Sequence, residues 1–470
     1  MRQDKKIKHK KRSITKKTLI YTGGSILASL SMAGSTYLYS KYTTTQDYGN
    51  FQLTVSIMML LATVGFLDIR TSTLRFMYGI AAENEDNRNK AIYSGGLIFT
   101  FCIFLLFLTV YIANRITNVP FPKIGFIWAL SYALGNFYLF VTRGLDKEYS
   151  YSIAYSLFYG ALLFLNLYFL AFRHYGAKYI LIAMTIAEFI QVIYLEMRIG
   201  ILKNFKPRFL DKKIIKHMIK FSIPLAVTAL GTWIMSYYAS IQVTAILGSS
   251  ANGIFSMAME FAKSVPMATA GIILAWQEIA FSRKTESINK IDTEYFSSSI
   301  TSIFRLFSCF FIVFIPLMQL VIPFYLSDAF QSVSLILALC TAGFTFDCIS
   351  QMVASIFGNN IDSRPIMIST IVGSLFLIIT LPFFIRYNST FGAPLCVCIA
   401  FGLTLLVRVL WLDIVLKFKI NHFKILLTLT LAVAVGYYST TSSIKMNILI
   451  LAIGLLIGIP TLRHERKKIN

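Results

Sequence analysis

The stretch DYGNFQLTVSIMMLLATVGFLDIR (residues 47–70) has no charged side chain between Asp47 and Asp68. An α-helix needs about 20 mostly apolar residues to cross the hydrocarbon core of a bilayer. The stretch therefore predicts a membrane-spanning helix over residues 51–69.

Similar apolar stretches follow one another along the whole chain, separated by short polar turns. Of the 470 residues, 56% are hydrophobic and only 14% are charged, whereas a soluble protein is nearer half apolar and a quarter charged. The composition and spacing predict an all-α polytopic membrane protein with about 14 transmembrane helices and no separate soluble domain. The predicted helices are 18–40, 51–69, 91–113, 124–142, 151–172, 179–196, 221–247, 253–281, 299–325, 333–357, 366–386, 393–416, 425–441 and 446–462.

The distribution of basic residues predicts the orientation of these helices. With the N-terminus inside, the inner segments hold 34 of the 44 Lys and Arg residues and the outer loops hold 7. Cytoplasmic loops of membrane proteins carry such an excess of Lys and Arg. We therefore expect a multi-pass protein of the bacterial cytoplasmic membrane with both termini in the cytoplasm. Topology and attraction to anionic lipid head groups account for the net charge of +23, so nucleic acid is not an expected partner.

Short matches suggest that the chain repeats itself after six helices. Gly49 and Phe51 in DYGNFQL match Gly253 and Phe255 in ANGIFSM, 204 residues later. Because six is an even number, the two halves would have the same orientation. This predicts two parallel six-helix bundles, an architecture that is common in transporters.

The predicted organisation has four parts. Residues 1–200 form an N-terminal bundle with a basic tail, and residues 201–220 form a basic cytoplasmic linker. Residues 221–417 form the second bundle, and residues 418–470 add two helices and a basic cytoplasmic tail.

Several of these segments also resemble a known family. The run YTTTQDYGNFQLTVSIMMLLATVGFLDIRTSTLRF (42–76) resembles the first signature of bacterial polysaccharide flippases of the Wzx type. FYLFVTRGLDKEYSYSIAYS (137–156), KFSIPLAVTALGTWIM (220–235) and LGSSANGIFSMAMEF (247–261) resemble later segments of that family, as does AWQEIAFS (275–282). The resemblance covers about residues 18–417. It departs at Ala239 and Ser240, where the family often has an Asp-Arg pair, so no role of that pair is carried over.

The resemblance implies a MATE-like fold, in the multidrug/oligosaccharidyl-lipid/polysaccharide exporter superfamily, and a transport function. The implied substrate is an oligosaccharide repeat unit on undecaprenyl pyrophosphate, flipped across the membrane for capsule, O-antigen or exopolysaccharide synthesis. A polysaccharide polymerase and a chain-length regulator are the implied protein partners, besides the membrane lipid. Sugars and pyrophosphate do not cross hydrocarbon unaided because unpaired polar groups cost several kcal/mol each there.

Three arginines at the inner ends of predicted helices are candidates for holding the pyrophosphate, because guanidinium groups bind phosphate with two parallel donors. Arg70 and Arg75 follow the second helix, and Arg143 follows the fourth. Arg75 and Arg143 lie in the family-like segments and rank first. Topology alone, or local pairing of Arg70 with Asp68, is the alternative interpretation.

Three further cations lie within predicted helices, where ionisable residues are functional candidates. Lys263 has Glu260 three residues before it on the same helix face, so a local ion pair is the alternative to a substrate contact. Arg305 and Arg408 lie in the inner halves of the ninth and twelfth helices and are candidates for contacting substrate.

Two carboxyl groups near the middle of predicted helices are candidates for ion coupling. Glu188 lies in the sixth helix and Asp347 in the tenth. Either group would carry a coupling proton or help to hold Na⁺; a structural hydrogen bond or ion pair is the alternative.

Other classes of function fit the sequence less well. The chain has no nucleophile–His arrangement, P-loop or Gly-rich dinucleotide motif, and its outer loops leave little room for a glycosyltransferase or polymerase site, so no enzyme activity, metal or cofactor is expected. A peptidoglycan-precursor flippase and a cation-coupled drug antiporter remain alternatives. The first helix carries no acidic residue between Thr18 and Ser40, which counts against the antiporter because cation-coupled exporters of the superfamily commonly use one there.

Overall fold

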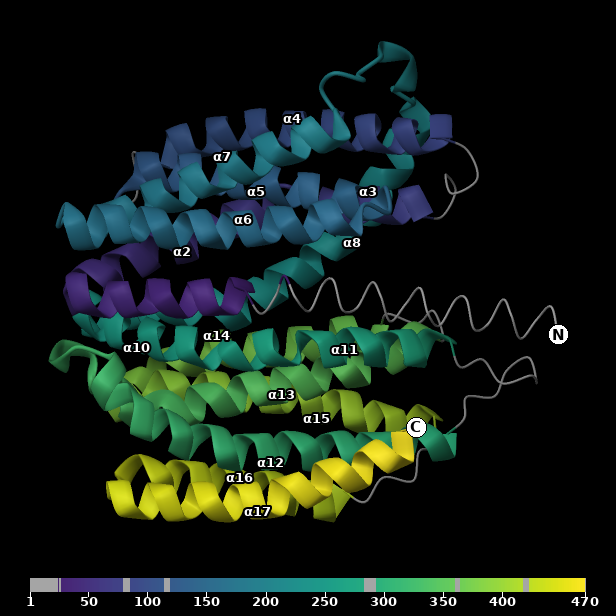
Figure 1. The fold of residues 1–470 in the computed structure, drawn as a ribbon. Coiled ribbons are helices and arrows are strands. Elements are labelled where there is room, and N and C mark those ends of the chain that lie inside the picture. The colour runs from purple at the N-terminus through teal and green to yellow at the C-terminus, as the bar shows by residue number, and fades with distance from the viewer. Residues whose placement is uncertain are drawn as a thin grey trace. The chain divides into compact units, whose positions relative to one another are not determined.

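The computed structural model describes residue 24 and residues 27–78, 85–113, 119–282, 293–359, 364–416 and 422–469. Within these residues the regular secondary structure is entirely helical (Figure 1). A helix over residues 27–42 comes first. The following long helices are α2 (Thr45–Val64), α3 (Ile69–Tyr78), α4 (Glu85–Ala113), α5 (Pro122–Gly144), α6 (Glu148–Asn166), α7 (Lys178–Ile199), α8 (Lys212–Trp233), α9 (Ala239–Leu247), α10 (Ser249–Ala262), α11 (Ser264–Ser282), α12 (Thr293–Tyr325), α13 (Val333–Asn359), α14 (Arg364–Asn388), α15 (Gly392–Leu416), α16 (His422–Thr441) and α17 (Ile444–Ile469).

Short helical turns complete the element order. Two are π-helical, η1 (Leu167–Phe172) directly after α6 and η3 (Ile234–Tyr238) between α8 and α9. Three are 3₁₀ turns: η2 (Pro207–Phe209), η4 (Asp328–Phe330) and η5 (Ser389–Phe391).

Each predicted helix range falls on helix wherever the structure describes it, with two internal breaks. The range 51–69 is interrupted by a turn in which Leu67 and Asp68 have positive φ, separating α2 from α3. The range 253–281 is interrupted at Lys263, just before Pro266, which has no N–H to continue the hydrogen-bond ladder from α10.

The number of membrane crossings is a separate question from the number of helices. In the described part of the chain, eight helical segments are long and apolar enough to span a bilayer by length and composition. The predicted total of fourteen spans stays a prediction.

The chain forms two compact units, and each is described by itself. Unit 1 consists of Met1–Thr43 and Asp47–Ile241, and unit 2 of Thr44–Gln46 and Gln242–Asn470. The seventh predicted helix, which begins with α8, packs on α3 and α4 and belongs to unit 1 as far as Ile241. The predicted division at residues 201–220 stays a prediction.

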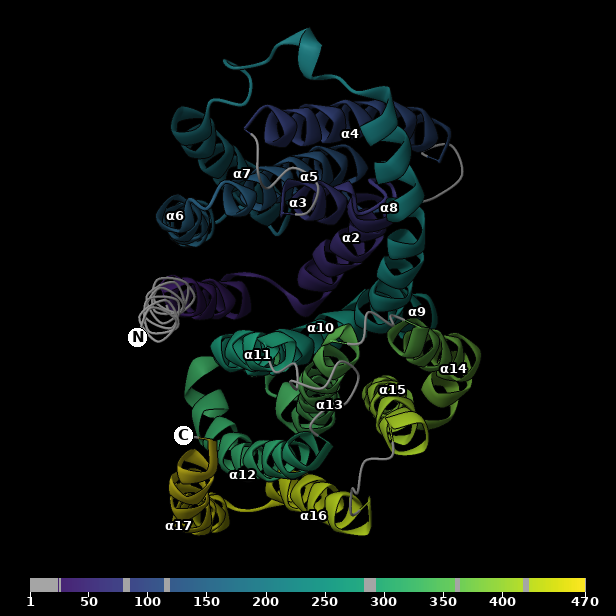
Figure 2. The ribbon, with the colours of Figure 1, turned by 90° about the vertical axis from the view of Figure 1, so that its right-hand side faces the viewer.

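In unit 1, helix α5 is the central element and contacts α3, α4, α6 and α7 (Figure 2). Pro122 opens this helix at a position where the missing N–H costs nothing. Helix α7 ends at Gly200, which takes the left-handed conformation (φ 69°) that favours glycine. Helix α8 begins at Asp211, whose side chain accepts hydrogen bonds from the backbone N–H of Lys213 and Ile214.

In unit 2, helix α13 is the central element and contacts α10, α11, α12, α14, α15 and α16. The two C-terminal helices α16 and α17 both pack on α12 (Figure 2). Helices α5 and α13 correspond to the fourth and tenth predicted helices, so corresponding members of the sequence repeat are central in their own units. This supports the predicted six-helix repeat.

Candidate functional site

The three candidate arginines of unit 1 differ in how they are paired. Arg70, in the first turn of α3, forms an ion pair with Asp68 (Nε to Oδ1, 3.0 Å). Its Nη1 donates to the side-chain oxygen of Asn136 at 3.0 Å, and its guanidinium lies 5.2 Å from the centre of the Phe140 ring. The expected local pairing of Arg70 with Asp68 is therefore present, and the Asp68 carboxylate offsets the positive charge of the Arg70 guanidinium.

Arg143, at the end of α5, is held by aromatic rings instead of by an acid. Its guanidinium lies 5.7 Å from the centre of the Phe140 ring, on its own helix, and 6.0 Å from that of Tyr151 on α6. Among the described residues it has no ion pair. The hydroxyl of Tyr78, at the end of α3, donates to the backbone oxygen of Arg143 at 2.6 Å, which ties the ends of α3 and α5 together.

Arg75, one turn before the end of α3, is exposed and is placed in a similar way. Its guanidinium lies 4.4 Å from the centre of the Phe221 ring on α8. The structure shows no ion pair of this residue within the described ranges. A cation stacked on a ring keeps its edge N–H donors available for an anion. Arg75 on α3 and Arg143 on α5 thus each place a cation against an aromatic ring, and the Tyr78 hydroxyl joins the ends of their two helices.

A row of tyrosines on α6 continues from Arg143 into the unit. Tyr151, Tyr155 and Tyr159 are spaced four residues apart and so share one helix face. Their rings are in contact, with centroids 6.1 Å apart in the first pair and 5.0 Å in the second. The hydroxyl of Tyr155 donates to that of Tyr159 at 3.5 Å. We call these three residues the tyrosine row.

Glu188 on α7 lies near the deep end of the tyrosine row, where it interacts electrostatically with Tyr159. Its side chain is only 3% exposed, and its Oε2 has no hydrogen-bond partner among the residues that the structure describes. The carboxyl lies against Gly135 of α5, where an added Cβ would be 2.2 Å from Oε2 and 3.0 Å from the side-chain nitrogen of Gln191. Glycine at this position therefore makes room for the Glu188 carboxyl group.

In unit 2, Arg408 on α15 and Asp347 on α13 lie close enough to interact electrostatically. Arg408 is 6% exposed. Its three nitrogens donate to Ser369 Oγ (2.9 Å), the backbone oxygen of Ser350 (2.9 Å) and Thr370 Oγ1 (3.2 Å). Asp347 accepts a hydrogen bond from Gln351 at 2.7 Å. The guanidinium therefore joins α13, α14 and α15.

Replacing Arg408 with lysine is expected to destabilise the protein, because one ammonium group does not reach three acceptors on two neighbouring helices. Loss of a hydrogen bond to a charged group costs about 1.5–3 kcal/mol. We expect a lower thermal unfolding midpoint of the purified protein, while Arg386→Lys, at the exposed end of α14, leaves it unchanged. An unchanged midpoint combined with lost transport would instead indicate a direct contact of Arg408 with substrate.

The other two candidate cations have different surroundings. Lys263, at the end of α10, forms an ion pair with Glu260 at 2.5 Å, which is the local pair that the sequence spacing offered as the alternative. Arg305 lies on α12 with an exposed side chain. Both residues belong to unit 2, whereas Arg75 and Arg143 belong to unit 1.

Sequence reasoning missed the residues that position the candidates. Phe140 and Asn136 precede Arg143 at helical spacing, and the run YSYSIAYSLFY (149–159) contains the four-residue tyrosine period. These signals were available in the sequence. Among the described residues, no group of three or more His, Cys, Asp or Glu side chains is placed to hold a metal ion.

Comparisons with known proteins show which fold this is. No protein-family model matches the chain, and no curated protein matches it. The chain is similar to the solved structure of the lipid II flippase MurJ in an inward closed conformation, with a TM-score of 0.68 and 15% identity over 96% of this chain and 100% of that one.

Two structures of multidrug resistance MATE family transporters of the MOP superfamily, one inward-facing and one outward-facing, are also similar. The inward-facing structure has a TM-score of 0.62 and 12% identity over 84% of this chain and 94% of that one. The outward-facing structure has a TM-score of 0.57 and 15% identity over 86% of this chain and 96% of that one. The predicted fold class, an all-α membrane protein with a MATE-like fold, is confirmed.

Proposed function

We propose that this chain is a flippase that moves oligosaccharide repeat units, linked to undecaprenyl pyrophosphate, across the bacterial cytoplasmic membrane for capsule, O-antigen or exopolysaccharide synthesis. The fold it shares with MurJ and MATE transporters supports membrane transport. Its resemblance to Wzx-type segments supports the polysaccharide branch. In this proposal, transport proceeds by alternating access, and the lipid tail stays in the bilayer while the polar head crosses.

The observation that carries the proposal is the placement of Arg75 and Arg143. Each guanidinium is stacked on an aromatic ring, has no acidic partner among the described residues, and lies at the inner end of its helix in the expected orientation. A pyrophosphate offers several anionic oxygens, which match the paired N–H donors of guanidinium groups. These two side chains would bind the pyrophosphate when it enters from the cytoplasm.

The remaining candidate residues take secondary roles in the proposal. Lys263, Arg305 and Arg408 of unit 2 would stabilise the anionic head group during its passage. Glu188 and Asp347 would couple transport to an ion gradient, and the unused oxygen of Glu188 supports such a role.

The second candidate function is flipping of the peptidoglycan precursor. It is favoured by the full-length likeness to MurJ, which is a lipid II flippase. A cation-coupled drug antiporter is the third, favoured by the likeness to MATE transporters. The three differ in substrate, so the lipids of a deletion strain separate them.

The experiment is to delete the gene in its host and analyse polyprenyl-linked intermediates by mass spectrometry. We expect a single undecaprenyl-pyrophosphate repeat unit to accumulate while surface polysaccharide is lost. An externally added glycosidase should fail to digest this unit in intact spheroplasts, which distinguishes a flipping block from a polymerase defect. Accumulation of lipid II would favour the second function, and unchanged lipids with increased drug sensitivity would favour the third.

A further inference from the structure

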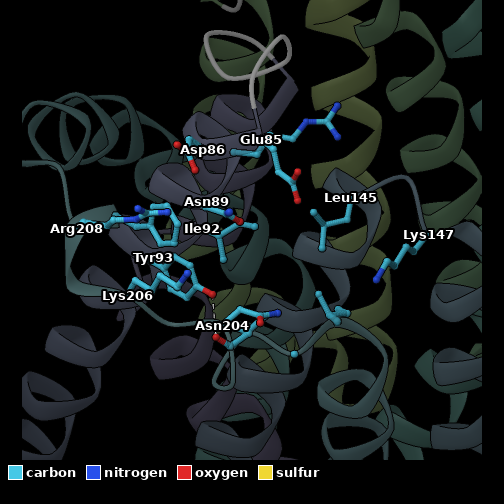
Figure 3. A pocket seen from close by; sticks show the side chains of 15 residues that line it. Glu85, Asp86, Asn89, Ile92, Tyr93, Leu145, Lys147, Asn204, Lys206 and Arg208 are labelled. Atoms are coloured by element: carbon cyan, nitrogen blue, oxygen red, sulfur yellow. Dashed lines mark hydrogen bonds between the residues drawn. The ribbon is translucent and has the colours of Figure 1, made fainter.

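A polar pocket of about 800 Å³ lies in unit 1 (Figure 3). It is formed by the first turns of α4, the turn between α5 and α6, and the segment 199–209 that follows α7. All of these parts belong to unit 1. The side chain of Arg143 faces Phe140 and Tyr151 and is not among the residues that line this pocket.

The wall made by segment 199–209 is held in place by specific bonds. The Glu196 carboxylate accepts hydrogen bonds from three successive backbone N–H groups, those of residues 201 (3.1 Å), 202 (2.9 Å) and 203 (3.4 Å). The hydroxyl of Tyr93 donates to the backbone oxygen of Ile201 at 3.0 Å. The Tyr93 ring stacks on Phe209, with centroids 5.5 Å apart and an interplanar angle of 9°. Hydrogen bonds and ring stacking therefore fix the position of this wall of the pocket.

The charged side chains that line the pocket are basic at Arg88, Lys147, Lys206 and Arg208 and acidic at Glu85 and Asp86. Arg88 forms an ion pair with Asp146 at 3.7 Å. Lys206 and Arg208 enter from one side and Lys147 from the other, and the Glu85 carboxylate points into the space between them (Figure 3). Within the described residues, neither Lys206 nor Arg208 forms an ion pair. The Arg208 guanidinium lies 5.0 Å from the centre of the Phe209 ring, which fixes its position. The amides of Asn89 and Asn204 add neutral donors and acceptors.

This combination of groups selects a particular kind of ligand. Lys and Arg without acidic partners bind phosphate oxygens. A carboxylate accepts hydrogen bonds from hydroxyl groups, and amides both donate and accept. The volume is that of a site for an ordinary small molecule, larger than a single phosphate ion requires.

We propose that this pocket binds a phosphorylated polyol, with its phosphate at Lys206 and Arg208 and its hydroxyls at Glu85 and the two amides. Two kinds of ligand carry a phosphate next to several hydroxyl groups: a soluble sugar phosphate, and the phosphoglycerol head group of a lipid such as phosphatidylglycerol. The site is distinct from the proposed pyrophosphate site and does not depend on the flippase assignment.

The test uses the purified full-length protein in nanodiscs of phosphatidylcholine, which has no polyol head group. Glucose 1-phosphate is the soluble probe, and its dissociation constant is measured by isothermal titration calorimetry. In the lipid arm, part of the phosphatidylcholine is replaced by phosphatidylglycerol and the thermal unfolding midpoint is followed. The variant is Lys206→Gln with Arg208→Gln, and Lys212→Gln with Lys216→Gln on the exposed surface of α8 is the charge-matched control.

We expect the pocket variant to weaken glucose 1-phosphate binding at least tenfold, or to abolish stabilisation by phosphatidylglycerol, while the control variant changes neither. Glu85→Ala should weaken the binding of glucose 1-phosphate but not that of inorganic phosphate, because it removes the side-chain oxygens that accept hydrogen bonds from hydroxyl groups. In the pocket variant, weaker binding of glucose 1-phosphate indicates a soluble ligand, and loss of stabilisation by phosphatidylglycerol indicates a lipid head group. The proposal is overturned if neither probe acts on the wild-type protein, or if both double variants lose binding equally. Because both replaced side chains are exposed, the variants are expected to fold, and their midpoints without ligand check this.

Discussion

Replacing Arg143 or Arg75 with glutamine is expected to lower the rate of repeat-unit flipping by ten- to a hundredfold. Each guanidinium lies against an aromatic ring and has no acidic partner among the described residues, so its charge would be available to the proposed pyrophosphate substrate. A hydrogen bond to a charged group is worth about 1.5–3 kcal/mol, and about 1.4 kcal/mol corresponds to a factor of ten. The measurement is surface polysaccharide per cell at equal membrane levels of the protein, with the repeat unit accumulating on its lipid carrier.

The chain offers a matched control for this experiment. Arg198, at the end of α7, is also an exposed arginine stacked on a ring, that of Tyr194 at 5.5 Å, but it is not a candidate for substrate binding. We expect Arg198→Gln to keep wild-type polysaccharide levels. Arg143→Lys should retain part of the activity because it keeps the charge but loses the paired donors. Full activity of both Arg75→Gln and Arg143→Gln would refute the assigned site.

Hydropathy was sufficient to predict the helices, because a membrane-spanning helix needs a long apolar stretch and little else. The breaks inside two of the predicted ranges depend on other information. The turn between α2 and α3 has positive φ at Asp68 and also at Leu67, and leucine seldom adopts this conformation. The break at Lys263 has a local cause in Pro266, and the sequence therefore contained the signal for it.

The candidate site was predictable to the extent that it depends on helical spacing. The pairing of Lys263 with Glu260 follows from a three-residue spacing and is present in the structure. The contact of Arg75 with Phe221 joins two helices that are far apart in the sequence, as does the packing of Glu188 on Gly135. Such contacts depend on tertiary packing, which a single sequence does not specify.

Replacing Glu188 with glutamine is expected to remove the dependence of transport on an ion gradient. Within the described part of the chain the buried Oε2 atom has no hydrogen-bond partner. An ionised carboxylate in that position is costly unless a proton or a small cation neutralises it. Glutamine has the same shape but no charge, so the variant is expected to fold and to lose only the exchangeable charge. The measurement is transport of a fluorescent lipid-linked oligosaccharide in proteoliposomes with an imposed pH or Na⁺ gradient. Wild-type protein should respond to one of the two gradients, and Glu188→Gln to neither.

Gly135 provides an independent approach to the same carboxyl group. A Cβ at this position would be 2.2 Å from Oε2, so Gly135→Ala forces the Glu188 side chain out of its place without removing it. We expect this variant to lose gradient dependence as Glu188→Gln does, whereas Gly160→Ala on α6, where nothing lies within 4 Å of the added atom, should behave as wild type. If Glu188 has only a structural role, Glu188→Gln and Gly135→Ala will lower the unfolding midpoint while the response to the gradient persists. Neither the presence nor the position of the Glu188 carboxyl would then matter for coupling.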